Sequence, residues 1–438
     1  MHDVLDPRDT VPDEAEQLRL SGYALPAELQ SALDTASRAG DGPSLHLLEP
    51  RLASEATRVA DWPYDEPDDA ASIFARMSGT GMPRTRAPEE AELRDRITGA
   101  WLGRCVGCCV GKPIEGLTPG QIRQYLAEAD AWPLLGYVPL SGRLPDGVEK
   151  LNPSWVDATL GNVDGMPRDD DIDYTILGLH VLETYGRSFT RHDIAHEWLD
   201  KLPFLQTFTA ERIVYRNVVS GIPVDEAAAW RNPYREWIGA LIRADVFGYI
   251  NPGLPEEAAR LAFADASLSH TGNGIYGEMW AAALVAEAFV SATAQEAVER
   301  SRRWIPRGSR LEEAVDRVIE LHAGGGSWED AIAWIDETFR EHSWVHTLNN
   351  AAVIVAGLIW GQNDPAKAIG LTVQAGYDTD SSAATVGSVM GAILGAAALP
   401  APLVVPLNDR IRSAVRGYDN SRISELAERT LAMALEGR

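Results

Sequence analysis

Apolar residues recur at helical spacing along most of the chain after residue 90. Between Asp171 and Tyr185 they fall at positions 172, 176, 179 and 182, close to the period of an amphipathic helix. Pro255 and two following glutamates are typical of a helix start, and we expect that helix to run to Leu268. Residues suited to strands form no series with hairpin turns, so the pattern predicts an all-α fold. Further helices are predicted over Glu278–Val290, Glu312–His322, Trp328–Phe339, Asn349–Trp360 and Pro365–Gln374.

The first 90 residues have a different pattern. Proline and acidic residues are scattered through them, and short helices are predicted only at Ala27–Ala36 and Ala70–Met77. We therefore divide the chain into an acidic N-terminal extension, residues 1–90, and a compact helical bundle, residues 91–438. The extension is expected to pack on the bundle or to offer a surface to a partner.

Two series of glycines repeat every fourth residue. Glycine inside a helix costs about 0.5–1 kcal/mol relative to alanine, so a series of them needs compensation, which close approach of two helix backbones would supply. We expect these two segments to be the central helices of the bundle. The glycines are Gly99, Gly103, Gly107 and Gly111 in the first series, and Gly387, Gly391 and Gly395 in the second.

The second glycine series lies in a stretch without charge, from Ser381 to Pro406. A membrane span needs about 20 predominantly apolar residues. This stretch follows Asp378 and Asp380 directly, is rich in alanine, glycine and serine, and ends near prolines. We interpret it as a buried helix of the bundle.

Composition narrows the possible partners. The 438 residues include 39 Lys and Arg against 64 Asp and Glu, which gives a net charge of 39 − 64 = −25. Such acidity argues against binding to nucleic acid or to anionic lipid, which need a basic surface. It leaves open a phosphate-bearing ligand, provided that bound cations supply positive charge.

The cysteines indicate a reducing compartment. The sequence has only three cysteines, Cys105, Cys108 and Cys109, and they lie too close together for disulfide bonds to link distant parts of the chain. We expect them to be small core residues of the first glycine-rich helix and the protein to be cytoplasmic. The N-terminal residues are acidic and lack an apolar core, so we predict no signal peptide.

A first acidic cluster precedes the helix predicted from Asp171. Asp169, Asp170, Asp171 and Asp173 place four carboxylates within five residues. A helix N-terminus favours negative charge, and this explains one or two of them. Mutual repulsion of all four favours a counter-cation, and hard divalent cations take carboxylate oxygens.

A second cluster precedes the uncharged stretch. Asp378, Asp380 and Ser381 form a compact set of oxygen donors, although a helix cap would explain one carboxylate. Two such sets, each at a helix start, raise the prospect of a shared site. Together they could hold two metal ions about 3.5–4 Å apart.

Other motifs give alternative interpretations. Asp169, Asp171 and Asp173 mimic the start of a calcium loop, but its glycine and its bidentate glutamate are missing. Asp169-Asp170-x-x-Asp173 also matches the aspartate-rich motif of magnesium-dependent, all-α terpene synthases, whose second motif we do not find downstream. The i, i+4 histidine pairs, His192 with His196 and His342 with His346, lack a third zinc ligand at a sensible spacing.

A further polar segment, Leu268 to Gly274, joins two predicted helices. Its histidine, small polar residues and backbone N–H groups suit an anion or a sugar. Equally, His270 could be a buried hydrogen-bond partner at a corner between helices. The segment supplies two candidate substrate contacts, His270 and Asn273.

Together these segments resemble the ADP-ribosylglycohydrolase family, which includes the dinitrogenase-reductase-activating glycohydrolases. Residues 94–103, continuing through Pro113-Ile114-Glu115, look like the family's glycine-rich helix and its Pro-x-Glu. Asp169–Asp171 falls where the family has Thr-Asp-Asp-Thr. Leu268–His270 resembles Leu-Thr-His, and Gly376–Ser381 resembles Gly-Gly-Asp-Thr-Asp-Thr. The four segments keep their order over about residues 91 to 415.

The resemblance implies an all-α hydrolase with two Mg²⁺ ions, or Mn²⁺ in some members. It implies cleavage of the bond from ribose C1″ to an acceptor in small-molecule or protein-linked ADP-ribose, or in a related ribosylated compound. Glu115 would be the mobile substrate glutamate and, with Asp171, a candidate general base. His270 would lie near the diphosphate or ribose, and Gly239 in a phosphate-cradling segment. The implied metal ligands are Asp169, Asp170, Asp171, Asp378, Asp380 and Ser381.

The chain also departs from the family pattern. Asp169 and Ile172 replace the two threonines, Cys108 stands where an aspartate is usual, and Tyr377 replaces a glycine beside the second cluster. These departures predict a divergent branch with a possible change of substrate. They also leave open a homologue that binds ADP-ribose without hydrolysing it.

Overall fold

The computed structural model describes residues 5–148 and 153–437. Its N-terminal part carries short helices and one small antiparallel two-stranded sheet, in which Tyr23 pairs with Arg58 and Ala24 with Thr57. The helices predicted here are confirmed, as α2 and α4. The elements are α1 (Pro7–Leu20), β1 (Tyr23–Ala24), α2 (Ala27–Ala39), α3 (Gly42–Glu55), β2 (Thr57–Arg58) and α4 (Ala70–Arg76).

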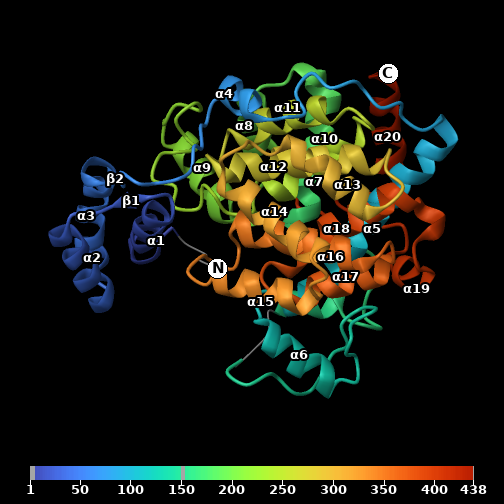
Figure 1. The fold of residues 1–438 in the computed structure, drawn as a ribbon, viewed down its shortest axis with the longest axis horizontal. Coiled ribbons are helices and arrows are strands. Elements are labelled where there is room, and N and C mark those ends of the chain that lie inside the picture. Colours follow the sequence, from blue (N-terminus) through green and yellow to red (C-terminus); the bar gives the residue numbers. More distant parts are fainter. Residues whose placement is uncertain (1–4, 149–152, 438) are drawn as a thin grey trace.

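The rest of the described chain is helical, which confirms the all-α prediction (Figure 1). Every helix predicted in this part is present, although α12 begins at Asn273 rather than at Glu278. The helices are α5 (Glu90–Gly111), α6 (Pro119–Glu128), α7 (Asp170–Tyr185), α8 (Arg191–Lys201), α9 (Thr209–Val219), α10 (Asp245–Tyr249), α11 (Pro255–Ala266), α12 (Asn273–Ala288), α13 (Ala294–Ser301), α14 (Arg310–Ala323), α15 (Trp328–Thr338), α16 (Thr347–Gly361), α17 (Pro365–Gln374), α18 (Thr379–Leu394), α19 (Ala401–Val404) and α20 (Ile423–Glu436).

Helices α5 and α18 pack backbone against backbone through their glycines. A Cβ atom added at Gly103 would overlap the carbonyl of Gly387, and one added at Gly107 would overlap that of Ala383. The predicted role of the two glycine series is confirmed. The close approach sets the end of α5 against the start of α18, where the Thr379 hydroxyl donates to the Gly111 carbonyl over 2.8 Å.

The core lies around this pair of helices. All residues of α12 are buried, and so is α18 from Thr379 to Ile393. The uncharged stretch is therefore an interior helix, as predicted. Among the helices of the described residues, none combines the length and apolar character that crossing a membrane requires.

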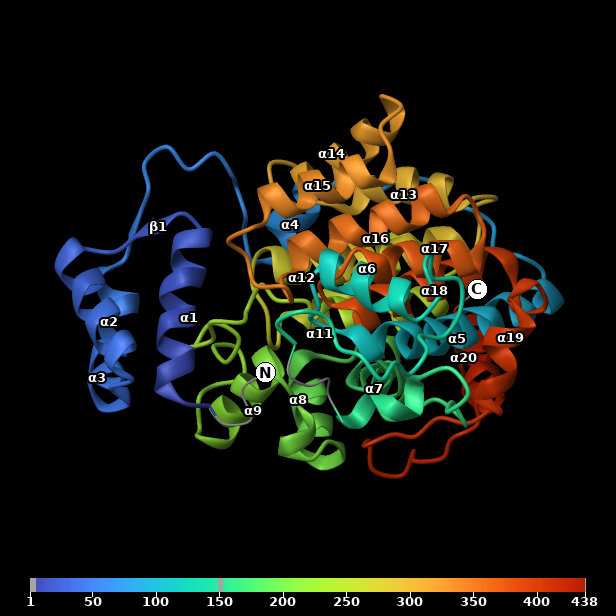
Figure 2. The same ribbon diagram turned by 90° about the horizontal axis from the view of Figure 1, so that it is seen from below.

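The extension packs on the helical body in two ways: Ile73 and Met77 at α4 are buried in the main apolar core, whereas α1 makes polar contacts. Helices α1 to α3 share a small apolar cluster of their own and stand to one side of the body (Figure 2). The docked face of α1 meets three consecutive body residues. The Tyr234 hydroxyl donates to Asp13 over 3.0 Å, Arg235 pairs with Glu14 at 2.7 Å, and the Gln17 amide donates to Glu236 over 2.7 Å.

A buried arginine ties the extension to the body. Arg310, at the start of α14, forms ion pairs of 2.7 Å with Glu66 of the extension and with Glu236 of the body. It also donates to the Leu20 carbonyl at the end of α1 over 2.9 Å. Only 8% of its side chain is exposed, so the charge depends on these partners.

Candidate active site

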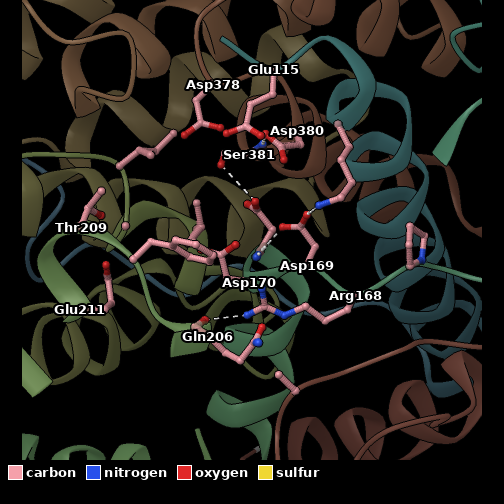
Figure 3. A pocket seen from close by; sticks show the side chains of 18 of the residues that line it. Glu115, Arg168, Asp169, Asp170, Gln206, Thr209, Glu211, Asp378, Asp380 and Ser381 are labelled. Atoms are coloured by element: carbon pink, nitrogen blue, oxygen red, sulfur yellow. Dashed lines mark hydrogen bonds and ion pairs between the residues drawn. The ribbon is translucent and has the colours of Figure 1, made fainter. Parts of the chain in front are cut away.

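A cavity of about 1020 Å³ opens where the end of α5 and the starts of α7 and α18 meet. The carboxylates predicted from the sequence come from three segments that are far apart in the chain, and Figure 3 shows them close together, with Glu211 on the facing side. The structure brings together all the metal and catalytic candidates that the sequence suggested. They are Glu115, Asp169, Asp170, Asp171, Asp378, Asp380 and Ser381.

Helix starts position most of these side chains. Asp169 caps α7, and its carboxylate accepts from the Asp171 backbone N–H over 3.1 Å. Asp378 occupies the corresponding position before α18, and its backbone N–H donates to the Asn350 side chain over 3.1 Å. Glu115 follows the short 3₁₀ turn that continues α5. The contact between α5 and α18 therefore sets Glu115 beside Asp378.

The acidic side chains form two groups that could hold a cation. Within each group the candidate ligand atoms all lie within 4.8 Å of one another. The Cys108 group consists of Cys108, Asp169, Asp171 and Asp380, and the Glu115 group consists of Glu115, Asp378 and Asp380. Asp380 belongs to both, whereas Asp170 lines the cavity and belongs to neither.

The Cys108 group is bonded to protein donors. The Lys112 ammonium forms an ion pair with Asp169. One oxygen of Asp171 accepts from the Ser381 hydroxyl over 3.1 Å. The other is buried without a hydrogen bond and lies 3.7 Å from the Arg104 guanidinium. An unpartnered buried carboxylate oxygen is a position that a cation would satisfy.

The pKa of Asp169 is shifted in the opposite direction from those of the neighbouring carboxylates. Burial opposes its ionisation, but the Lys112 ammonium outweighs burial and holds the pKa of Asp169 below its usual value. Burial first, and then the neighbouring carboxylates, raise the pKa of Glu115, Asp378 and Asp380. Lys112 offsets only part of the rise in pKa at Glu115 and Asp380, and within the described residues none of the three carboxylates forms an ion pair, so their donor chemistry fits a hard cation.

The facing wall carries Gly239 and an ion pair. Figure 3 shows Thr209 and Glu211 on this wall, which Gly239 also lines, and a Cβ added to Gly239 would overlap the Glu211 carboxylate. Glu211 pairs with Arg243 at 2.6 Å, with both side chains buried. This wall therefore has no space for a side chain at Gly239, and it carries the charged side chain of Glu211.

Two predicted contacts do not line the cavity. His270 is 1% exposed, and its Nδ1 forms a 2.7 Å hydrogen bond with the Ser269 hydroxyl. The Asn273 amide is also buried and donates to Glu66 and Glu236 over 2.8 and 2.9 Å. Both residues lie behind the site in polar networks of the fold, so direct contact with a ligand in this cavity does not follow from the structure.

The structure also bears on the alternative motifs. Asp173 is fully buried and bonded to Arg168, Ser413 and the Ala414 backbone, so it does not join Asp169 and Asp170 at the cavity. The aspartate-rich interpretation needs all three at one surface. The three cysteines are buried and unpaired, as predicted, although Cys108 lies at the cluster.

A family model described as ADP-ribosylglycohydrolase matches residues 89–438. This chain belongs to the ADP-ribosylglycohydrolase family. A solved structure named "ADP-ribosylglycohydrolase-related protein complex" is similar at 21% identity, with a TM-score of 0.49, and covers 80% of this chain and 100% of that chain. A search of curated proteins found no match.

Membership of the ADP-ribosylglycohydrolase family supports glycosidic hydrolase activity, and the acidic groups of the cavity could hold metal. Lys112 and Glu211 are among the cavity residues that were not predicted from the sequence. Lys112 had a signal, because it lies three residues before Glu115 at the end of the first glycine series. Glu211 had none, since only the fold brings α9 to the cavity.

Proposed function

We propose that this protein is a metal-dependent hydrolase that cleaves the glycosidic bond at ribose C1″ of an ADP-ribosylated substrate or a related ribosylated compound. One observation carries the proposal: in a member of this family, carboxylates from three distant segments converge on one cavity of about 1020 Å³. That volume suits a ligand of nucleotide size.

The proposed metal site uses the acidic wall. Its ligands are drawn from Asp169, Asp170, Asp171, Asp378, Asp380 and Ser381, with Glu115 alongside, and Mg²⁺ or Mn²⁺ suits these oxygen donors. A bound cation would supply Lewis-acid polarisation and would orient the ribose hydroxyls. Lys112 decides how many cations the donors accommodate.

Glu115 is the proposed proton acceptor. It is more exposed than Asp171, which is buried and bonded to Ser381, so Glu115 can reach a water molecule in the cavity more easily. Asp171 remains the second candidate base. On the facing wall, Gly239 would leave room for the diphosphate. His270 and Asn273 would support the binding site from behind.

Replacing the carboxylates of the Glu115 group tests the proposal. Asp378→Asn and Asp380→Asn should each reduce the release of ADP-ribose by at least about a hundredfold, measured by chromatography on ADP-ribosylated arginine, serine and acetyl ester substrates with added Mg²⁺. Glu299→Gln, an exposed carboxylate on α13, is the matched control and should keep full activity. Full activity of both cavity variants would refute the assignment.

Binding without hydrolysis is the second candidate. The Lys112 ion pair at Asp169 and the fully buried Ile172 both depart from the family pattern at the acidic wall. Calorimetry that detects ADP-ribose binding, together with no release from any of these substrates, would select this function. A terpene-type synthase has no support from the family match.

We also propose that residues 1–90 and 91–438 are separate units of the chain, since the family match begins at residue 89. The buried free cysteines support a reducing, cytoplasmic location.

A further inference from the structure

The two acidic groups differ in the positive charge that the protein supplies to them. Lys112 lies within the Cys108 group and bonds to Asp169. Among residues 5–148 and 153–437, no lysine, arginine or histidine forms an ion pair with Glu115, Asp378 or Asp380. Lys112 therefore forms a direct ion pair only within the Cys108 group, and it acts on Glu115 and Asp380 by attraction over a longer distance.

The backbone fixes the position of Lys112. It follows Gly111, the last residue of α5, whose carbonyl is held by the Thr379 hydroxyl of α18. It is also one helical turn beyond Cys108, so both side chains project towards the start of α7. Only 12% of the Lys112 side chain is exposed. The ammonium is therefore enclosed at the acidic wall and does not sample solvent as a surface lysine would.

Donors already occupy most ligand atoms of the Cys108 group. One oxygen of Asp169 accepts from the Asp171 backbone and the other pairs with Lys112. One oxygen of Asp171 accepts from Ser381, and the other, which has no hydrogen bond, lies 3.7 Å from the buried Arg104 guanidinium, a second positive charge of the protein. Cys108 contributes a thiol, which is a poor ligand for a hard cation. A divalent cation here would have to displace the ammonium or lie against it, and the two charges would repel.

The Glu115 group offers the opposite environment. Its three carboxylates converge without a basic partner, and they line the open cavity. Asp380 accepts from the Ser381 backbone N–H over 3.1 Å, which leaves further lone pairs for a cation. Oxygen donors that lack a counter-charge are the expected place for Mg²⁺ or Mn²⁺.

We infer that this chain holds a single divalent cation, in the Glu115 group, and that the Lys112 ammonium replaces the second cation of the two-ion centre that the sequence resemblance implies. The inference rests on the proposed metal dependence but concerns the number of ions. It assigns Asp169 to Lys112 and removes it from the metal ligands. Lys112 thereby acts as a positioning residue for Asp169 and as a fixed charge.

Manganese provides a direct count. Isothermal titration calorimetry should give one Mn²⁺ per wild-type chain, and electron paramagnetic resonance should show the resolved hyperfine spectrum of an isolated ion. The double variant Lys112→Ala with Asp169→Thr removes the charge pair and frees its space. It should bind two Mn²⁺ ions, whose separation of about 3.5–4 Å gives an exchange-coupled spectrum. Lys367→Ala, a half-buried lysine on α17 that does not line the cavity, is the control and should bind one ion.

Two coupled ions in the wild type would overturn the inference, and so would a folded double variant that still binds one ion. If the double variant does not fold, as judged by circular dichroism, the wild-type count alone decides. Failure of the proposed function looks different: no manganese binds to the wild type, or one ion binds and no ADP-ribosyl substrate is hydrolysed.

Discussion

Two interfaces of this protein hold segments that lead into the cavity, and they are built in opposite ways. Helices α5 and α18 touch through bare backbone, with no space for a Cβ atom at Gly103 or Gly107. Helix α1 meets the body through hydrogen bonds and ion pairs. The first interface has no room for an added side-chain atom at these glycines, and its glycine series can be recognised in the sequence. The second consists of separate polar contacts between residues far apart in the chain, and these leave no regular pattern in the sequence.

Each interface positions a different wall. The α5–α18 contact sets Glu115 beside Asp378, at the acidic wall. Helix α1 holds residues 234–236, and the next three residues, Trp237 to Gly239, line the cavity. A second cavity of about 550 Å³ lies beneath α1 and shares Thr209, Trp237 and Val345 with the first. The extension thus helps to shape the space around the site.

The largest expected effect comes from a single methyl group between α5 and α18. Gly107→Ala should lower the free energy of unfolding by about 4 kcal/mol or more, because backbone must move to admit the Cβ atom. Urea denaturation measures it. Gly120→Ala on α6, where a Cβ would meet no neighbouring atom, should be neutral or slightly stabilising. Equal effects at the two positions would contradict the backbone contact.

Removing the buried charge of the second interface should have the next largest effect. Arg310→Met leaves Glu66 and Glu236 buried without their partner, which should cost about 3 kcal/mol in the same denaturation experiment. Arg317→Met, an exposed arginine on the same helix, is the control. If Arg310→Met lowered the free energy of unfolding by less than about 1 kcal/mol, the Arg310 ion pairs would not be what holds the extension to the body.

The polar interface should also respond to pH, unlike the glycine contact. Burial, and then the nearby Arg310, lower the pKa of His342 to about 4. Between pH 6.5 and 4 the unfolded chain therefore binds a proton that the folded chain refuses, so stability falls as the pH falls. From pH 6.5 to 5.5 this residue should cost about 1 kcal/mol. His342→Phe should remove that part of the pH dependence, and an unchanged slope would exclude His342 as its source.

The smallest effect is expected at a single contact of α1. Tyr234→Phe removes the hydrogen bond to Asp13 and should cost about 0.5 kcal/mol. Thermal unfolding compared with Tyr215→Phe, on α9, measures the difference. A loss as large as that of Arg310→Met would mean that α1 docks through this one bond.

Much of the body could be predicted because its signals are local. Proline at a helix start and regular apolar spacing are set by neighbouring residues, and the glycine series reports backbone contact directly. Helices α1 and α3 were not predicted. Pro12 and Pro50 lie inside them, and their helical state depends on packing against each other and on the body.

The site was predicted in part for the same reason. The acidic clusters are continuous in sequence and could be found, and the resemblance supplied their common location. Tertiary packing decides whether the side chains of His270 and Asn273 point into the cavity or into the core, and no short motif encodes that packing. The pairing of Lys112 with Asp169 joins residues 57 positions apart and became visible only in the fold.

The Lys112–Asp169 pair also changes what controls the charge of the site. A bound ion is lost when its free concentration drops below its dissociation constant, whereas a lysine side chain is present in every copy of the protein. The Lys112 ammonium thus supplies part of the positive charge at the cavity as a covalent part of the polypeptide, and this charge does not vary with the concentration of magnesium. The ammonium cannot, however, exchange ligands as a metal ion does, so this half of the acidic wall is constant in charge and fixed in geometry.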